Sequence, residues 1–135
     1  METSRPVVIR RVPDRLNQRS AKAFLMEMEP LLRKDRPQIV LDLSQVRQMD
    51  AAGIDMLLKC MSEAMRRDGD VKLASLTPQA SFLLELTRTD RLFECFDTAT
   101  DAARSFHGFY PNVMDRNRME VARKQAAETK EERVA

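Results

Sequence analysis

The chain has 135 residues, of which 43% are hydrophobic and 33% are charged, and this suits one compact domain with a packed core and a highly charged surface. Its 23 basic and 21 acidic residues leave a net charge of +2, which gives no general attraction for nucleic acid or acidic membranes. No apolar run approaches the roughly 20 residues that cross a bilayer, and residues 1–11 lack the apolar segment of a signal peptide. We therefore expect a cytoplasmic protein with no direct membrane insertion.

The first third of the chain predicts a strand and then a helix. Residues 6–12 begin with Val7, Val8 and Ile9 and predict a strand, which the flanking arginines place near a sheet edge. Ser20 is the predicted N-cap of a helix that reaches about residue 33, with a kink or a late break at Pro30. The predicted apolar stripe of this helix consists of Ala23, Leu25, Met26, Leu31 and Leu32.

The middle of the chain has the clearest pattern. Residues 38–43 form a nearly continuous apolar run, typical of a strand buried on both faces. Residues 50–53 open a second helix, and its stop is predicted at residues 68–70, Asp-Gly-Asp. The apolar positions of this helix follow helical spacing at Ile54, Leu57, Leu58, Met61, Ala64 and Met65.

The last part of the pattern repeats the alternation. Residues 71–76 predict a strand, and Thr77-Pro78 predicts the start of a third helix that carries apolar residues at 82, 83 and 86. Residues 92–96 predict a short strand or extended segment, and Asp97 is the predicted cap of a fourth helix reaching Phe106. Such alternation predicts an α/β domain over residues 6–107, with a mixed, mostly parallel sheet of four to five strands flanked by about four helices. Residues 108–135 form a charged extension, which we expect to be partly helical or disordered.

Catalytic signals are weak. The single histidine, His107, has no companion for acid–base or metal chemistry, and the three glycines lie too far apart to form a phosphate-binding loop. Cys60 and Cys95 both have apolar neighbours, so we expect buried, reduced thiols. We therefore predict that the protein is not an enzyme and has no cofactor and no metal site.

Two nearby carboxylates, Asp50 and Asp55, have structural explanations. Asp50 is placed to accept hydrogen bonds from the first free amides of the second helix. Asp55 lies within the first two turns, where a negative charge complements the positive end of the helix. Since Asp55 also adjoins an exposed turn, a role in contacting a partner stays open.

Three segments occur in a characteristic order: the end of a strand, Leu41-Asp42-Leu43-Ser44; the turn Met49-Asp50-Ala51-Ala52-Gly53-Ile54; and residues 86–93, LTRTDRLF. In this order the chain resembles a STAS domain, the fold of bacterial anti-sigma factor antagonists. The resemblance covers roughly residues 6–107 and implies that the turn at residues 50–53 lies on the partner-binding face. In the antagonists, the residue just after this aspartate is a serine or threonine, which an anti-sigma factor with kinase activity phosphorylates to release the complex. Here that position is Ala51, which has no hydroxyl group, so the usual switch cannot operate there.

Two further departures from the family concern the N-terminal region. Relatives usually have two N-terminal strands, so we expect the first to be short or missing here. That would leave an edge open to another copy of the chain, in a homodimer, or to another chain. The next loop in relatives carries a glycine and then an aspartate, whereas here it reads Asp14-Arg15-Leu16-Asn17. Because this loop borders the expected partner surface, Asp14, Arg15 and Asn17 join the candidate partner-binding residues.

Three functions are compatible with these residues. The leading hypothesis is a non-catalytic, protein-binding regulator that resembles an anti-sigma factor antagonist, lacks the phosphoacceptor, and binds an anti-sigma factor or serine kinase. The alternative is a STAS scaffold subunit of a stress-sensing assembly or of a membrane transporter complex. An enzyme or nucleotide-binding protein is disfavoured because phosphate-cradling glycines and a catalytic set are missing. Within residues 44–55, Ser44 is the sole hydroxyl that a kinase could modify.

Overall fold

The structure is a computed structural model that describes residues 6–107. The predicted extension over residues 108–135 lies outside this range. In chain order the elements are β1 (Val7–Arg11), β2 (Arg15–Leu16), α1 (Gln18–Leu32), β3 (Gln38–Asp42), β4 (Gln48–Met49), α2 (Ala51–Met65), β5 (Asp70–Ala74), α3 (Pro78–Leu86), the 3-10 helix η1 (Thr89–Arg91), β6 (Cys95–Phe96) and α4 (Ala99–Arg104).

Four strands form one sheet in the order β1-β3-β5-β6, and β2 and β4 form a separate short pair. The register places Ile9 beside Val40 and Val40 beside Lys72. The predicted α/β fold, with a mostly parallel sheet of four to five strands and about four helices, is confirmed, and every pairing between described strands is parallel. Among the strands of residues 6–107, β1 lies at the edge, as predicted.

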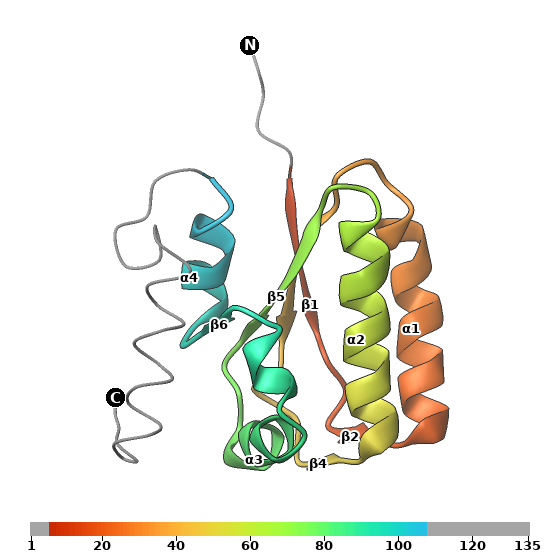
Figure 1. The fold of residues 1–135 in the computed structure, drawn as a ribbon, viewed down its shortest axis with the longest axis vertical. Helices are drawn as coiled ribbons and strands as arrows, with labels where there is room; N and C mark the ends of the chain where they lie inside the picture. The colour runs from red at the N-terminus through yellow and green to blue at the C-terminus, as the bar shows by residue number, and fades with distance from the viewer. Residues whose placement is uncertain (1–5, 108–135) are drawn as a thin grey trace.

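The helices cover the two faces of the sheet unequally. α1 and α2 lie side by side against one face, and the shorter α4 lies against the other (Figure 1). Since successive strand residues point to opposite faces, Ile39 and Leu41 join the large core beneath α1 and α2, while Val40 joins a smaller core with Phe96 and Ala102. All three strand residues are at most 1% exposed, which confirms a strand buried on both faces.

The start of α1 differs from the prediction. Asn17, and not Ser20, is the N-cap: its side chain accepts a hydrogen bond from the backbone N–H of Ser20 at 2.9 Å. The Ser20 hydroxyl accepts one from the N–H of Asn17 at 3.0 Å, so the two residues form a reciprocal capping box. Ser20 therefore lies three residues inside the capped turn.

The buried face of α1 also differs from the predicted stripe. The predicted members Ala23 and Met26 face solvent, whereas Leu32 is buried and Leu25 and Leu31 are partly buried against the core. The other buried residues of the helix are Ala21, Phe24 and Met28, which were not predicted. The helix ends two residues after Pro30, which agrees with the predicted late break.

The predicted stop after α2 is confirmed. The N–H of Gly69 donates to the carbonyl oxygen of Ala64 at 2.8 Å and closes the helix end. A Cβ atom at position 69 would overlap the carbonyl oxygen of Pro37, so glycine is required for this close approach to the start of β3.

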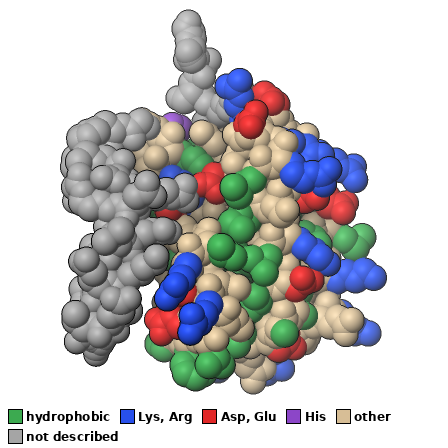
Figure 2. All heavy atoms as spheres, viewed as in Figure 1, with side chains coloured by type: hydrophobic (Ala, Val, Ile, Leu, Met, Phe, Trp, Pro, Cys, Tyr) green, Lys and Arg blue, Asp and Glu red, His purple; other side chains and the backbone are tan. Residues whose placement is uncertain are grey.

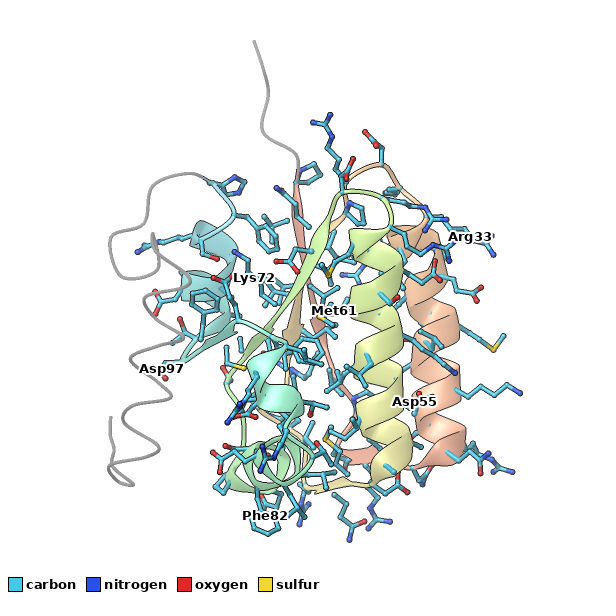
Figure 3. All side chains as sticks on the ribbon, viewed as in Figure 1. Arg33, Asp55, Met61, Lys72, Phe82 and Asp97 are labelled. Carbon is cyan, nitrogen blue, oxygen red and sulfur yellow. The ribbon has the colours of Figure 1, made fainter. Side chains whose placement is uncertain are left out.

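α3 begins as predicted but buries a different face. The Thr77 hydroxyl accepts a hydrogen bond from the N–H of Ala80 at 3.2 Å, and proline occupies the first helical position. The helix buries Ala80 and Leu84, and it leaves Phe82 and Leu86 65% and 66% exposed. Phe82 lies at the lower end of the molecule (Figure 3), where Figure 2 shows hydrophobic side chains at the surface.

The region that follows is less extended than predicted. The short strand or extended segment predicted over residues 92–96 is present as the two-residue strand β6, Cys95–Phe96, which pairs with β5. Leu92 is exposed at the end of η1. The N-cap of α4 is Thr98, and not Asp97, because the Thr98 hydroxyl is the group that accepts from a first-turn amide, at 3.0 Å. The helix then ends at residue 104, before the predicted residue 106.

Candidate functional site

The first turn of α2 is held by a side-chain cap. A carboxylate oxygen of Asp50 accepts a hydrogen bond from the backbone N–H of Ala52 at 2.9 Å, as predicted, and Asp50 has an extended backbone. Its own N–H donates to the carbonyl oxygen of Leu16 at 3.1 Å. The turn is therefore fixed from both sides before the helix begins.

The side chains of this turn point in different directions. Asp50 and Ala51 are exposed, Ala52 is half-buried, and Gly53 is buried together with Ile54. The helix end is thus on the surface, and position 51 presents a small methyl group to solvent. A partner that approaches this end of the molecule would contact the methyl group of Ala51 beside the carboxylate of Asp50.

The loop over residues 14–17 lies directly beside this turn. The short parallel pair β2–β4 aligns Arg15 with Gln48 and Leu16 with Met49. The carbonyl oxygen of Asp14 accepts hydrogen bonds from the N–H groups of residues 47 and 48, at 2.7 and 3.1 Å. The structure therefore brings together the two segments named from the sequence, residues 14–17 and 50–53, although the two-residue strands that join them were not predicted.

Gly53 fixes how closely the two segments approach. A Cβ atom at this position would lie 2.8 Å from Cγ of Met49 and 3.0 Å from Cβ of Leu16. Such distances are too short for carbon atoms, so only glycine lets α2 rest against β2 and β4 in this arrangement. The surface formed by residues 14–17 and 50–53 is consequently one packed unit.

Two helix N-termini end at this surface. Asn17 caps α1 and Asp50 caps α2, and in Figure 1 both helices start at the same end of the molecule. Among the candidate residues, the side chain of Asn17 is therefore engaged in the capping box, whereas the side chains of Asp14 and Arg15 are exposed.

Asp55 lies on the side of α2 that faces α1 (Figure 3). Its carboxylate forms an ion pair with the ammonium group of Lys59 at 3.1 Å, and both side chains are about 60% exposed, at 62% and 60%. This pair lines a groove of about 360 Å³ between the two helices, with Leu25, Met26 and Met56 on the apolar side. The negative charge of Asp55 is therefore partly balanced by the cation of Lys59.

A polar cluster that the sequence did not reveal lies under α4. Lys72 points from β5 toward α4 (Figure 3), and its ammonium group is 3.1 Å from the carboxylate of Glu94 and 2.6 Å from the hydroxyl oxygen of Ser105. The same group lies 4.2 Å from the ring centre of Phe106 and 5.7 Å from that of Phe96. The cluster joins the smaller core to α4 and is distant in sequence from the α2 turn.

Groups suited to catalysis are scattered. Within residues 6–107, no three or more His, Cys, Asp and Glu side chains are placed to hold a metal ion. His107 is exposed, Cys60 is buried, Cys95 is half-buried, and neither cysteine is disulfide-bonded. In the same part of the chain, no helix combines the length and the apolar character that a bilayer crossing requires.

The model of the STAS domain family matches residues 1–102 of this chain. A solved structure of a candidate anti-sigma factor antagonist from Thermotoga maritima is 25% identical, with a TM-score of 0.68, over 75% of this chain and 88% of that one.

More distant structures show the same fold. An anti-sigma-factor antagonist (STAS) domain protein from Planctomyces limnophilus is 17% identical, with a TM-score of 0.67, over 74% of this chain and 90% of that one. The STAS domain of a SulP transporter from Vibrio cholerae is 16% identical, with a TM-score of 0.59, over 77% and 83%. The same fold therefore occurs both in antagonist-like proteins and as a transporter domain.

Proposed function

This chain belongs to the STAS domain family, and we propose that it is a cytoplasmic, non-catalytic regulator that binds an anti-sigma factor or serine kinase through the first turn of α2. The exposed Ala51, beside the Asp50 cap, is the observation that carries this proposal. The adjoining residues 14–17 and the exposed Asp55 complete the binding surface.

The chemistry of position 51 sets the mode of regulation. A phosphate at this turn would add about −1.5 to −2 charges and considerable bulk to the middle of a fitted interface, and it would separate the partners. Alanine cannot accept a phosphoryl group, so the protein stays competent to bind whatever the kinase activity of its partner. Its control then comes from its own abundance or from the partner.

The first experiment identifies the partner and tests the surface. The chain is co-purified with partners from its native source, and the affinity of the purified partner is compared for the wild type, Ala51→Asp and Ala23→Asp, the last being the same change at an exposed alanine of α1. We expect Ala51→Asp to weaken binding by on the order of 2 kcal/mol or more, and Ala23→Asp to have little effect. Equal affinities for all three proteins would place the interface elsewhere.

The second experiment tests the missing acceptor. If the partner is a kinase, it should phosphorylate Ala51→Ser and not the wild type, and phosphorylation should release the variant. Incorporation of phosphate into the wild type at Ser44, the remaining hydroxyl within residues 44–55, would contradict a permanently active form.

The alternative role is that of a scaffold subunit, in a stress-sensing assembly or beside a transporter. The fold likeness to a SulP transporter STAS domain favours it. Recovery of transporter subunits as the stoichiometric partner, without a kinase or sigma regulator, would decide for this alternative.

A further inference from the structure

The outer edge of β1 has backbone groups that point away from the sheet. The N–H of Val12 donates to the carbonyl oxygen of Asp42 at 2.9 Å, and the register pairs Arg11 with Asp42. In a parallel ladder this bond means that the backbone N–H and C=O groups of the even-numbered residues of β1 point toward β3. The N–H and C=O groups of Val7, Ile9 and Arg11 therefore face outward, where β1 has no neighbouring strand among the described residues.

We propose that two copies of this chain pair through these edges, antiparallel, about a two-fold axis beside Ile9. Ile9 of one copy then faces Ile9 of the other, and Val7 of each copy faces Arg11 of the other. All of these residues carry outward N–H and C=O groups, so the three facing pairs exchange about six backbone hydrogen bonds. The contact is isologous and closed, and the two four-stranded sheets become one continuous sheet.

The charges of β1 distinguish between the possible registers. Arg10 lies opposite Val8 and Arg11 lies opposite Val7, so each guanidinium group faces an aliphatic side chain. A shift by two residues in one direction would bring Arg10 opposite Arg10, where like charges repel. A shift in the other direction would leave fewer facing pairs within Val7–Arg11. The register centred on Ile9 is therefore the one that keeps the most facing pairs and places no two arginines directly opposite each other.

The exposed apolar surface agrees with the same arrangement. Ile9 is 43% exposed, although strand residues of this size usually pack against a neighbour. It lies on the same face of the sheet as Val7, which packs against the smaller core. In the pair the two Ile9 side chains meet across the axis and leave water, which adds a hydrophobic contribution to the hydrogen bonds.

One interaction must be exchanged for the pair to form. The Arg10 guanidinium donates to the carbonyl oxygen of Ile9 at 3.2 Å, and this carbonyl is one of the outward groups. Because the bond is exposed and joins adjacent residues, its loss costs little. The pairing surface is short, so we expect a reversible dimer with a dissociation constant on the order of 10 µM or weaker.

The dimer leaves the proposed partner surface open. β1 strands run in opposite directions across the axis, so the two α2 turns point to opposite ends of the pair. The inference therefore stands independently of the proposed function.

The primary test is sedimentation equilibrium of the full chain under reducing conditions, over a range from about 5 to about 500 µM. The average mass should rise from 15.6 kDa toward twice that value. Ile9→Pro should stay monomeric with an unchanged circular dichroism spectrum, because it deletes an N–H that does not bond to β3. Ile9→Val keeps the N–H and should dimerise like the wild type.

A cross-linking test fixes the register. In a Cys95→Ser background, Ile9→Cys should be joined across the axis by a short bifunctional thiol reagent, because the facing Cα atoms are expected about 5.5 Å apart. Val7→Cys is the matched control: its copies would lie about 14 Å apart along the strands and should not be joined. A monomeric wild type at all concentrations, a dimeric Ile9→Pro, or cross-linking at position 7 without position 9 would each overturn the proposal.

Discussion

Replacement of Lys72 by methionine should destabilise the protein strongly. The ammonium group of Lys72 lies 3.1 Å from the carboxylate of Glu94, and the two side chains are only 8% and 10% exposed. Methionine has a similar length and fills most of the space, so the cost comes from a carboxylate that loses its cation in a buried site. Removal of one partner of a buried pair costs about 3–5 kcal/mol. This is a large share of the roughly 5–15 kcal/mol by which domains of this kind are stable.

The assay is urea unfolding followed by far-ultraviolet circular dichroism. Lys59→Met is the matched control, because it removes the same group from an exposed ion pair with Asp55 and should cost at most about 1 kcal/mol. The double variant Lys72→Met/Glu94→Leu removes both buried charges and should recover most of the stability. If Lys72→Met and Lys59→Met lower the free energy of unfolding equally, the pair under α4 is solvated and the reasoning fails.

Substitutions at three further positions test other parts of the fold. Gly53→Ala gains about 1 kcal/mol of helix propensity, but the overlap of its methyl group with side chains of β2 and β4 should produce a net loss of about 1–3 kcal/mol, measured by thermal unfolding. Asp50→Ala should lose about 0.5–2 kcal/mol in the same assay, whereas Asp50→Asn keeps the cap and should lose far less. Burial raises the pKa of the Cys60 thiol from 9.0 to about 12, so its contribution to stability is fully present below about pH 9 and is lost as the pH rises toward 12. Cys60→Ala should remove that dependence from a pH series of unfolding curves, and half-buried Cys95 should react with a thiol reagent before Cys60 at pH 8.

The features predicted correctly are set by neighbours in the sequence. Asp50 and Thr77 cap helices through amides two or three residues away, so the sequence alone contains both partners. The strand over residues 38–43 is apolar on both faces, which leaves little choice of environment.

The features that were missed depend on distant contacts. Lys72 alternates with apolar residues in its strand and therefore resembled a solvent-facing position, whereas its hydrogen-bond partner Ser105 is 33 residues away. Glu94, in a short segment flanked by Phe93 and Cys95, was the one local sign of a buried charge there. β2 and β4 have two residues each, too few to establish a period.

The predicted face of α1 was wrong at Ala23 and Met26 because two apolar sets overlap in its sequence. Ala23 and Met26 have helical spacing, and so do Phe24 and Met28, so the pattern alone does not say which pair faces the core. The cap at Asn17 settles the start of the helix three residues earlier than predicted. When a helix has two apolar sides, packing against the rest of the fold determines which side is buried. The sequence pattern of the helix alone does not identify that side.

In the first turn of α2, different residues cap the helix and pack it against the neighbouring strands. The cap belongs to Asp50, and the close contact with β2 and β4 belongs to Gly53, so residue 51 serves neither and its side chain stands free of the fold. An exchange between alanine and serine at this position is therefore expected to add or remove a hydroxyl group with little effect on the fold. Under the proposed function, one such substitution would convert a permanently competent binder into one that a kinase can regulate, while the fold beneath it stays the same.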